Sequence, residues 1–373
     1  MDFLCKFVPI MIYKAILNIR NRAYDKGRRK SFEADVPTIC IGNITVGGTG
    51  KTPHTELVLR TLLGSDDWAY ANLAVLSRGY KRKGRGFQLV PIGGSAKDFG
   101  DEPVQIAGKF PIATVAVDKD RVEGCRILAH PENQDHGPAQ VIILDDAFQY
   151  RRLRAGLNIV LVDYNRPIFK DKLLPFGKLR DLHSRIGDAD IIIVSKCPPY
   201  IDDAERVEWA RNLGIEGYET STCRGKSKKG REQVLLFTGI AYSHMIPVFP
   251  EIAENRFTYA KRLVLFTGIA NDAPLRSYLC DSYKIVKRLE FPDHHQYTSS
   301  DIGKIVKAMD AYPTACVATT EKDAGRILDS KKIPEELKKR LFQVPIEVMF
   351  PSELEQQVFE ATVLGFLREH APA

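Results

Sequence analysis

Apolar and polar positions follow one another along the chain in short blocks that predict strands and helices. The predicted strands are runs of consecutive apolar residues at 36–43, 73–80, 87–92, 112–117, 141–146, 158–164 and 190–196. Apolar residues three and four positions apart predict helices between several of these strands, at 53–63, 101–109, 119–129 and 203–213. Because strands that are apolar throughout are buried on both faces, the pattern predicts a mostly parallel sheet between layers of helices.

A second series of strands follows a polar, basic stretch at 225–231 (GKSKKGR), which we interpret as a linker. The strand patterns lie at 233–239, 262–270, 283–291, 315–320 and 346–350, and a last helix is predicted at 352–369. The chain is therefore expected to have three parts: an N-terminal helix with a basic cluster over 1–31, a large α/β domain over 32–225, and a smaller α/β domain over 226–373.

The first 30 residues have a different pattern. Apolar residues at 3, 4, 7, 8, 11, 12, 15, 16 and 19 lie on one face of a helix, which Pro9 is expected to kink or to delay. A signal peptide carries its positive charge before its apolar stretch, whereas here the charge follows. This order favours a helix lying in the headgroup layer of an anionic membrane, and a helix packed on the protein's own core is the alternative. The cations that follow the stripe are Arg20, Arg22, Lys26, Arg28, Arg29 and Lys30.

Composition narrows the possible classes of protein. The length of 373 residues suits two domains, and 44% hydrophobic with 27% charged residues is ordinary for a folded chain. The 7 cysteines are odd in number and contain no C-x-x-C, which argues against a disulfide framework and a zinc site. The net charge of +7 is modest and the basic segments have no interleaved aromatic residues, so no nucleic-acid partner is expected. No apolar run approaches the ~20 residues of a membrane span.

Residues 42–52 (GNITVGGTGKT) stand between a predicted strand and a predicted helix, which is the setting of a phosphate-binding loop. The final Gly-Lys-Thr matches the second half of the pattern G-x-x-x-x-G-K-[ST]. Thr45 stands where the pattern has its first glycine, and two glycines follow shortly after it and supply backbone freedom. The residues expected to bind nucleotide are Thr45, Val46, Gly47, Gly48, Thr49, Gly50, Lys51 and Thr52.

This loop predicts a P-loop NTPase-like α/β fold, with the smaller α/β domain and the N-terminal amphipathic helix added to it. Lys51 is expected to reach the β- and γ-phosphates of the nucleotide, and the Thr52 hydroxyl is expected to hold Mg²⁺. A phosphate loop with Mg²⁺ needs a carboxylate at the end of a nearby strand. Asp145, at the end of VIILD, supplies one, although paired aspartates after a strand also form turns.

Other polar clusters are candidates for substrate chemistry. Asp101 could accept a proton from an attacking hydroxyl, or could simply favour the start of a helix. The segment 291–297 (FPDHHQY) could supply a base or a group that orients one, and solvated loop histidines are the alternative. The loop 76–87 (LSRGYKRKGRGF) ends a strand in a run of cations that suits an anionic substrate or a membrane surface. The loop 173–181 (LLPFGKLRD) adds Arg180 and Asp181 and is a weaker signal alone.

Taken in order, the motifs GNITVGGTGKTP, LSRGYKRKGRG, GDEP, VDKDR, DDAFQ, LLPFGKLRD, FTGIAN, FPDHHQY and TTEKDA resemble those of the tetraacyldisaccharide 4'-kinase family. The resemblance runs from the N-terminal helix to about residue 326. It implies transfer of the γ-phosphate of ATP, with Mg²⁺, to the 4'-hydroxyl of a tetraacyldisaccharide 1-phosphate, which forms the lipid A precursor lipid IVA. It also implies a peripheral protein at the cytoplasmic face of the inner membrane of Gram-negative bacteria.

The resemblance implies roles for individual residues. Asp145 supports the metal with Thr52, and Asp146 lies beside it in the active site. Asp101 is the expected base on the sugar hydroxyl, paired with His294 from the second domain. Two positions depart from the family: Ala147 replaces the usual glycine, and Asp181 stands where glutamate is more common. The residues expected to bind the acceptor are Arg78, Arg121, Gln149, Arg180 and Asp181.

Two other functions remain open at this level. A membrane-recruited ATPase switch can carry a glycine-rich loop and an amphipathic helix, but such loops begin with a second lysine that is absent between Gly42 and Gly50. A kinase of a small soluble metabolite would need no membrane helix. We expect a monomer whose two domains close on ATP and lipid together, because His294 comes from the second domain.

Overall fold

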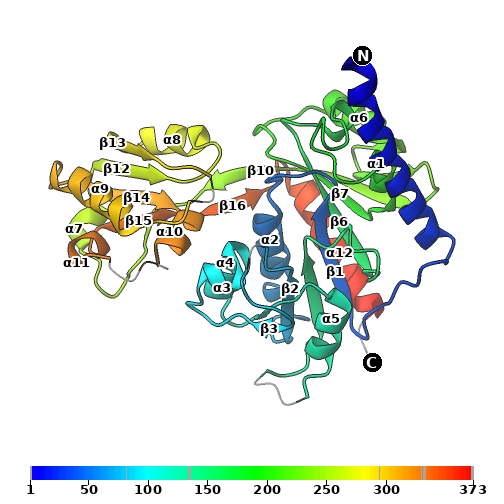
Figure 1. Ribbon diagram of the computed structural model, residues 1–373, viewed down its shortest axis with the longest axis horizontal. Coiled ribbons are helices and arrows are strands. Elements are labelled where there is room, and N and C mark those ends of the chain that lie inside the picture. Colours follow the sequence, from blue (N-terminus) through cyan, green and yellow to red (C-terminus); the bar gives the residue numbers. More distant parts are fainter. Residues whose placement is uncertain are drawn as a thin grey trace.

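The computed structural model describes residues 2–80, 82–132, 136–293, 295–328, 330 and 333–370, with the backbone alone for residues 2–10. The chain forms a large unit and a smaller unit (Figure 1). They are joined by β10 (Glu232–Tyr242) and β16 (Ile346–Met349), which pair antiparallel and run from one unit to the other.

The large unit is built on one sheet with the strand order β3-β4-β2-β5-β1-β6-β7-β10-β9-β8. Every pair from β4 to β10 is parallel, and β3, β9 and β8 are antiparallel additions. The predicted fold class, a mostly parallel sheet flanked by helices, is confirmed. The strands are β1 (Thr38–Asn43), β2 (Leu73–Ser77), β3 (Gln88–Leu89), β4 (Thr114–Val117), β5 (Val141–Asp145), β6 (Leu157–Asp163), β7 (Ile191–Ser195), β8 (Ile215–Glu219) and β9 (Arg224–Ser227).

Helices cover both faces of this sheet, as its fully apolar strands require. The core on one face takes Leu59 and Leu62 from α2 (Lys51–Leu63), Ile106 from α4 (Asp101–Lys109), and Phe359 from α12 (Glu353–His370). The core on the other face takes Leu128 from α5 (Arg121–Ala129) and side chains of α6 (Asp203–Leu213). Three short helical turns lie in the connections: α3 (Ala96–Phe99), η1 (Ile168–Lys170) and η2 (His183–Asp188).

The smaller unit is a second α/β layer with the strand order β11-β15-β14-β12-β13, and all pairs except β11–β15 are parallel. Its strands are β11 (Ile246–Pro247), β12 (Arg262–Thr267), β13 (Lys284–Glu290), β14 (Cys316–Thr320) and β15 (Leu341–Val344). Its helices are α7 (Asn255–Thr258), α8 (Ala273–Cys280), α9 (Ser299–Asp310), α10 (Glu321–Leu328) and α11 (Glu335–Lys338).

The passage between the two units differs from the expected linker at 225–231. This stretch contains the end of β9 and a tight turn into β10, so it belongs to the large sheet. β10 pairs with β7 as far as Thr238 and with β16 from Gly239 onward. The structure thus places the crossing at residues 238–239 rather than at 225–226, and α12 returns to the large sheet after the smaller unit.

α1 (Asp2–Asp25) begins at Asp2 and continues through Pro9, so the proline does not delay its start. Leu17 faces the protein and is buried. On the opposite face Met11, Ile12, Ile16 and Ile19 are between 55% and 70% exposed. The protein's own core therefore does not cover this part of the predicted apolar stripe. Among the described residues, no helix has the length and apolar character needed to cross a membrane.

Candidate active site

The phosphate loop leaves β1 at Asn43 and enters α2 at Lys51. Gly47 and Gly50 have φ angles of 112° and 86°, in the left-handed region that glycine adopts without a steric penalty. Gly50 is the residue immediately before the first turn of α2. The loop therefore delivers the chain to a helix N-terminus, where unpaired N–H groups and the helix dipole favour an anion.

Three successive carbonyl groups of the loop are held by side chains. Lys196 Nζ donates to Gly48 O, Ser195 Oγ donates to Thr49 O at 2.8 Å, and His54 Nδ1 donates to Gly50 O at 2.7 Å. In a trans peptide the next N–H points opposite to the carbonyl. The N–H groups of Gly50 and Lys51 therefore point away from these side chains.

Two oxygen atoms beside the loop suit a hard cation. Thr52 Oγ1 and Asp145 Oδ1 are both buried and have no hydrogen-bond partner among the residues that the structure describes, while Asp145 Oδ2 accepts from Ser77 Oγ at 3.2 Å. Burial, and secondarily the charge of Glu102, raise the pKa of Asp145 to about 7. A hydroxyl and one carboxylate are the sparse oxygen set with which proteins hold Mg²⁺ on a nucleotide, so these residues fit the ion.

Asp146 is the centre of the polar contacts at this edge of the sheet. It follows β5 with a φ of 53°, an uncommon conformation for a residue other than glycine. Arg180 binds both of its carboxylate oxygens, and Lys51 Nζ lies 3.9 Å from Oδ1. Burial alone would raise the pKa of Asp146, but the charges of Lys51 and Arg180 outweigh it and lower the pKa.

Asn43 connects this cluster to the loop. Its Oδ1 accepts from Arg180 at 2.6 Å, and its Nδ2 donates to Thr49 Oγ1 at 2.7 Å. Gln149 Nε2 donates weakly to Asn43 O at 3.5 Å. Asn43 was not predicted as a site residue, although it lies inside the motif GNITVGGTGKT.

The expected acceptor residues Arg121 and Arg78 lie at the same edge. Arg121 is buried over the ring of Tyr150, and its Nη2 donates to Asp146 O at 3.5 Å. Burial, and next the charge of Arg78, lower the pKa of Arg121. The structure thus brings Lys51, Arg121, Gln149 and Arg180 together around Asp146, with Arg78 near enough to repel Arg121.

The loop 171–181 reaches the site by pairing with the start of the phosphate loop. Val46 N donates to Lys178 O at 2.7 Å, and Arg180 N donates to Ile44 O at 2.9 Å. This backbone pairing positions the guanidinium group of Arg180 over Asp146.

Asp181 has a different environment from the other expected acceptor residues. Its carboxylate is fully buried and accepts from Arg20 Nη2 at 2.9 Å and Asn21 Nδ2 at 3.0 Å, both on α1. Tyr13 of the same helix donates to Arg180 O at 2.9 Å. Asp181 therefore holds α1 against the loop that carries Arg180, and its assignment to the acceptor remains a prediction.

Asp101 is the first residue of α4 and lies where the two units meet. Arg326 of α10 donates to Asp101 Oδ2 from Nε at 3.0 Å and from Nη2 at 2.8 Å. The same fully buried arginine also donates to Asp323 Oδ1 and to Gly268 O. The pairs Glu102–Lys322 and Lys109–Glu321 complete the α4–α10 contact.

The histidine segment is only partly described. His294, the expected partner of Asp101, lies outside the described residues. His295 contacts Asp301 Oδ2 at 3.0 Å and stacks on Phe291, so it belongs to the start of α9. In the basic loop, Lys81 also lies outside the described residues. Arg82 is buried, and its guanidinium group donates hydrogen bonds to Gln88 Oε1 and to Val117 O.

Arg326, His54, Ser195 and Lys196 were not predicted as site residues. Arg326 lies two residues after the end of the motif TTEKDA (319–324), and this proximity was the one signal in the sequence that could have identified it.

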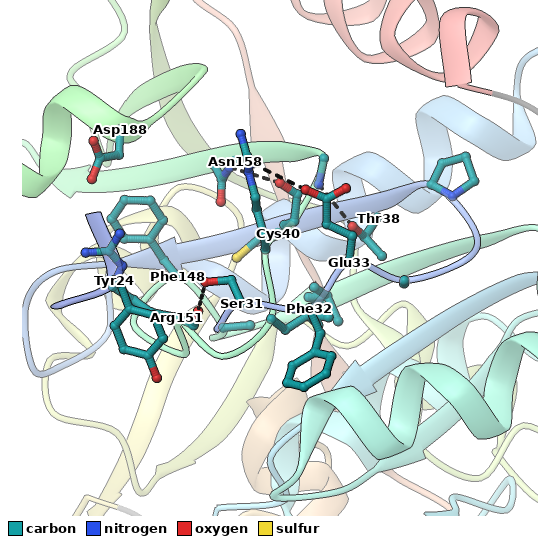
Figure 2. A pocket seen from close by; sticks show the side chains of 18 of the residues that line it. Tyr24, Ser31, Phe32, Glu33, Thr38, Cys40, Phe148, Arg151, Asn158 and Asp188 are labelled. Atoms are coloured by element: carbon teal, nitrogen blue, oxygen red, sulfur yellow. Dashed lines mark hydrogen bonds and ion pairs between the residues drawn. The ribbon is translucent and has the colours of Figure 1, made fainter. Parts of the chain in front are cut away.

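A large cleft is lined in part by Ala147 and Phe148, which stand between Asp146 and Gln149 in the chain. It has a volume of about 1000 Å³ and lies beneath the segment that joins α1 to β1 (Figure 2). Ser31 Oγ donates to Arg151 O across it, and Arg151 also pairs with Asp25. Of the predicted site residues that the structure describes, none lines it.

Comparison with known proteins agrees with this geometry. The profile of the family described as Tetraacyldisaccharide-1-P 4'-kinase matches residues 7–363. Tetraacyldisaccharide 4'-kinase of Phocaeicola vulgatus is 37% identical over 96% of this chain and 94% of its own. The namesake enzyme of Parabacteroides distasonis is 38% identical over 94% and 91%. A crystal structure of LpxK from Aquifex aeolicus in complex with ATP has a TM-score of 0.69 and 26% identity, covering 97% of this chain and 99% of that one. The chain belongs to the tetraacyldisaccharide-1-P 4'-kinase family.

Proposed function

We propose that this chain transfers the γ-phosphoryl group of ATP to the 4'-hydroxyl of a tetraacyldisaccharide 1-phosphate, a step of lipid A biosynthesis. The observation that carries the proposal is the family match over residues 7–363. The loop with Gly47, Gly50 and Lys51, which precedes a helix N-terminus, supports it. Neither an ATPase switch nor a soluble-metabolite kinase is favoured by a match of this extent.

Phosphoryl transfer requires positioning and charge neutralisation more than covalent chemistry. Lys51 and the N–H groups that follow Thr49 would bind the phosphates. Thr52 and Asp145 would hold Mg²⁺, which supplies positive charge to the phosphate oxygens when it is bound. Arg180, held by Asp146 and Asn43, would stabilise negative charge near the transferred group.

Asp101 would accept the proton of the attacking hydroxyl, with His294 as its partner. Two charge-assisted hydrogen bonds from Arg326 hold the Asp101 carboxylate in place where the two units meet. The acceptor's 1-phosphate would bind cations from the group Arg78, Arg121 and Arg180, which lies at the same sheet edge.

The chemical assignment is tested by incubating the protein with γ-labelled ATP and a tetraacyldisaccharide 1-phosphate in detergent micelles, followed by chromatography. The label is expected on the glycolipid. Asp101→Ala and His294→Ala should each lower kcat far more than they raise the KM for ATP, and the double variant should lose little more than either alone. Release of labelled inorganic phosphate without acceptor, or labelling of a soluble metabolite only, would overturn the proposal.

The location of the enzyme is a separate proposal: α1 lies on the cytoplasmic face of the inner membrane. The support is its exposed face of Met11, Ile12, Ile16 and Ile19, together with the exposed cations that follow. Replacing Ile16 and Ile19 with glutamate should weaken binding to phosphatidylglycerol-containing vesicles by about tenfold or more. Val207→Glu, at an exposed apolar position on α6, is the control and should bind like the wild type. Equal binding by all three proteins would contradict the membrane role of α1.

A further inference from the structure

His54 lies on the first turn of α2, is 1% exposed, and has a partner on each ring nitrogen. Nδ1 lies 2.7 Å from Gly50 O, and Nε2 lies 3.0 Å from Thr238 Oγ1. A carbonyl can only accept, so Nδ1 carries the proton, and Nε2 accepts from the Thr238 hydroxyl. The ring thus bridges the last glycine of the phosphate loop to β10.

Thr238 occupies a particular place in β10. It is the last residue that pairs with β7, opposite Ser195, and Gly239 is the first that pairs with β16. Residues 239–242 and 346–349 form the two-stranded connection between the units (Figure 1). The second end of the His54 bridge is therefore at the point where the chain leaves the large sheet.

The register partner of Thr238 holds the same loop. Ser195 Oγ donates to Thr49 O at 2.8 Å, one residue before the glycine that His54 holds. Each of the adjacent strands β7 and β10 is thus connected to one carbonyl of the loop. Ser195 of β7 binds Thr49 O directly, and Thr238 of β10 is connected to Gly50 O through the imidazole ring of His54. A shift of Gly50 on binding phosphate would move a ring that is packed and bonded at both ends, and interiors of this density transmit such shifts.

We propose that His54 is a positioning residue that couples occupancy of the phosphate loop to the β10–β16 connection, and so to the approach of the smaller unit. This inference rests on the proposed nucleotide-binding function and adds to it a route between the loop and the second unit. Coupling between two sites is reciprocal and commonly changes affinity by about 5- to 150-fold. ATP bound at the loop would accordingly favour the arrangement of β10 and β16 that binds acceptor, and bound acceptor would favour ATP to the same degree.

The test measures amide hydrogen exchange over residues 239–242 and 346–349 in the full chain, with and without a non-hydrolysable ATP analogue. The analogue should slow exchange in the wild type. Thr238→Val removes the hydroxyl at nearly constant shape and should reduce this effect about fivefold or more, while the analogue still binds within about fivefold of wild type. Thr238→Ser should restore the effect, and His54→Asn, which keeps a donor near Gly50 O but is too short for Thr238, should behave like Thr238→Val.

Thr55→Val is the matched control. Thr55 is the next residue of α2 and is fully buried, but its hydroxyl has no hydrogen-bond partner in the described part of the chain, so its loss should leave the exchange effect unchanged. The inference would be overturned by an equal nucleotide effect in Thr238→Val and wild type, or by failure of Thr238→Ser to restore it. It would also be overturned if the analogue bound the wild type without slowing exchange, and the proposed function would then stand. An analogue that does not bind the wild type would overturn both.

Discussion

Two buried side chains, Ser195 and His54, hold carbonyl groups of the phosphate loop, and the pKa of His54 is strongly shifted. Burial lowers the pKa of His54 to about 4, against the small opposing effect of the Gly50 carbonyl. Between about pH 6.5 and pH 4 the folded protein therefore keeps the ring neutral, whereas the unfolded chain protonates it. Neutrality matters because an imidazolium ring has two donors, and its Nε2 could no longer accept from Thr238.

This difference predicts a contribution of His54 to acid sensitivity. Between the unfolded value of 6.5 and the folded value of about 4, the unfolded state binds a proton that the folded state does not, so stability falls as pH falls through this window. At about pH 5 the loss from this residue is about 2 kcal/mol. His54→Gln should therefore lose fewer degrees of melting temperature than the wild type between about pH 7.5 and pH 5. An equal or greater loss in the variant would show that the ring is not buried in its neutral form.

At this scale the sequence predicts residues whose partners belong to the same motif, and misses those whose partners are distant. Lys51 and Thr52 were identifiable because loop and helix follow one another in the chain. The role of His54 depends on its hydrogen bond with Thr238, and that of Asn43 on its hydrogen bond with Arg180. Each partner is more than a hundred positions away in the chain. Asp181 was singled out because it lies in a recognisable motif. That motif does not predict its buried contacts with Arg20 and Asn21 of α1.

Among the elements, α1 and the loop 171–181 form one assembly at the edge of the site. Tyr13, Arg20 and Asn21 contact the backbone of Arg180 or the carboxylate of Asp181. A second tie, Asp25 to Arg151, lies at the end of the helix, where the aspartate is half exposed. A buried charge left without its partner costs far more than an exposed ion pair, which contributes about 0–1 kcal/mol. Asp181 should thus dominate the attachment of α1.

Asp181→Asn is predicted to loosen α1 without unfolding the large sheet. The amide keeps the size and one acceptor for Asn21, but Arg20 loses its charged partner, and opening of the helix should become about tenfold more frequent. Hydrogen exchange over residues 13–25 measures this opening. Asp25→Asn, on the same helix but exposed, serves as the control and should change exchange much less. If both variants loosen α1 equally, burial of Asp181 is not what anchors the helix.

Periodicity alone predicted the long, strongly patterned elements well. The helices expected at 101–109 and 203–213 have those bounds in the structure, and the strand patterns around β1, β5, β6 and β7 coincide with buried strands. β8, the edge strand, and β9, which lies between β8 and β10, were missed because they are short, contain glycine and have no apolar alternation. Because β9 was missed, residues 225–231 were interpreted as a linker, which was wrong. Lysine and glycine are common in linkers but also suit the hairpin turn that joins β9 to β10.

On the scale of the whole molecule, two kinds of contact join the units: the β10–β16 ribbon and the ion pairs between α4 and α10. Asp101–Arg326 differs from the other pairs because Arg326 is only 1% exposed and also binds Asp323 and Gly268 O. Glu102–Lys322 is about one-third exposed on both sides. Through this pair, Arg326 of the smaller unit holds Asp101, the proposed base, in position. A contact between two distant segments of this kind cannot be predicted from a pattern in either half of the sequence.

Arg326→Gln is therefore predicted to impair turnover beyond any loss of nucleotide binding. Removing the guanidinium breaks its hydrogen bonds to Asp101, Asp323 and Gly268 O, and breaking a buried ion pair by removing one partner costs about 3–5 kcal/mol. We expect kcat to fall at least about tenfold with little change in the KM for ATP, and Arg326→Lys to recover little, because an ammonium cannot match the planar fork.

Lys322→Gln is the control for Arg326→Gln, since it removes a partly exposed pair from the same interface and should change kcat little. Because Arg326 is argued to act through Asp101, the double variant Arg326→Gln/Asp101→Asn should be no slower than Asp101→Asn alone. Multiplicative losses in the double variant, or equal losses in Arg326→Gln and Lys322→Gln, would mean that Arg326 serves only to hold the interface together.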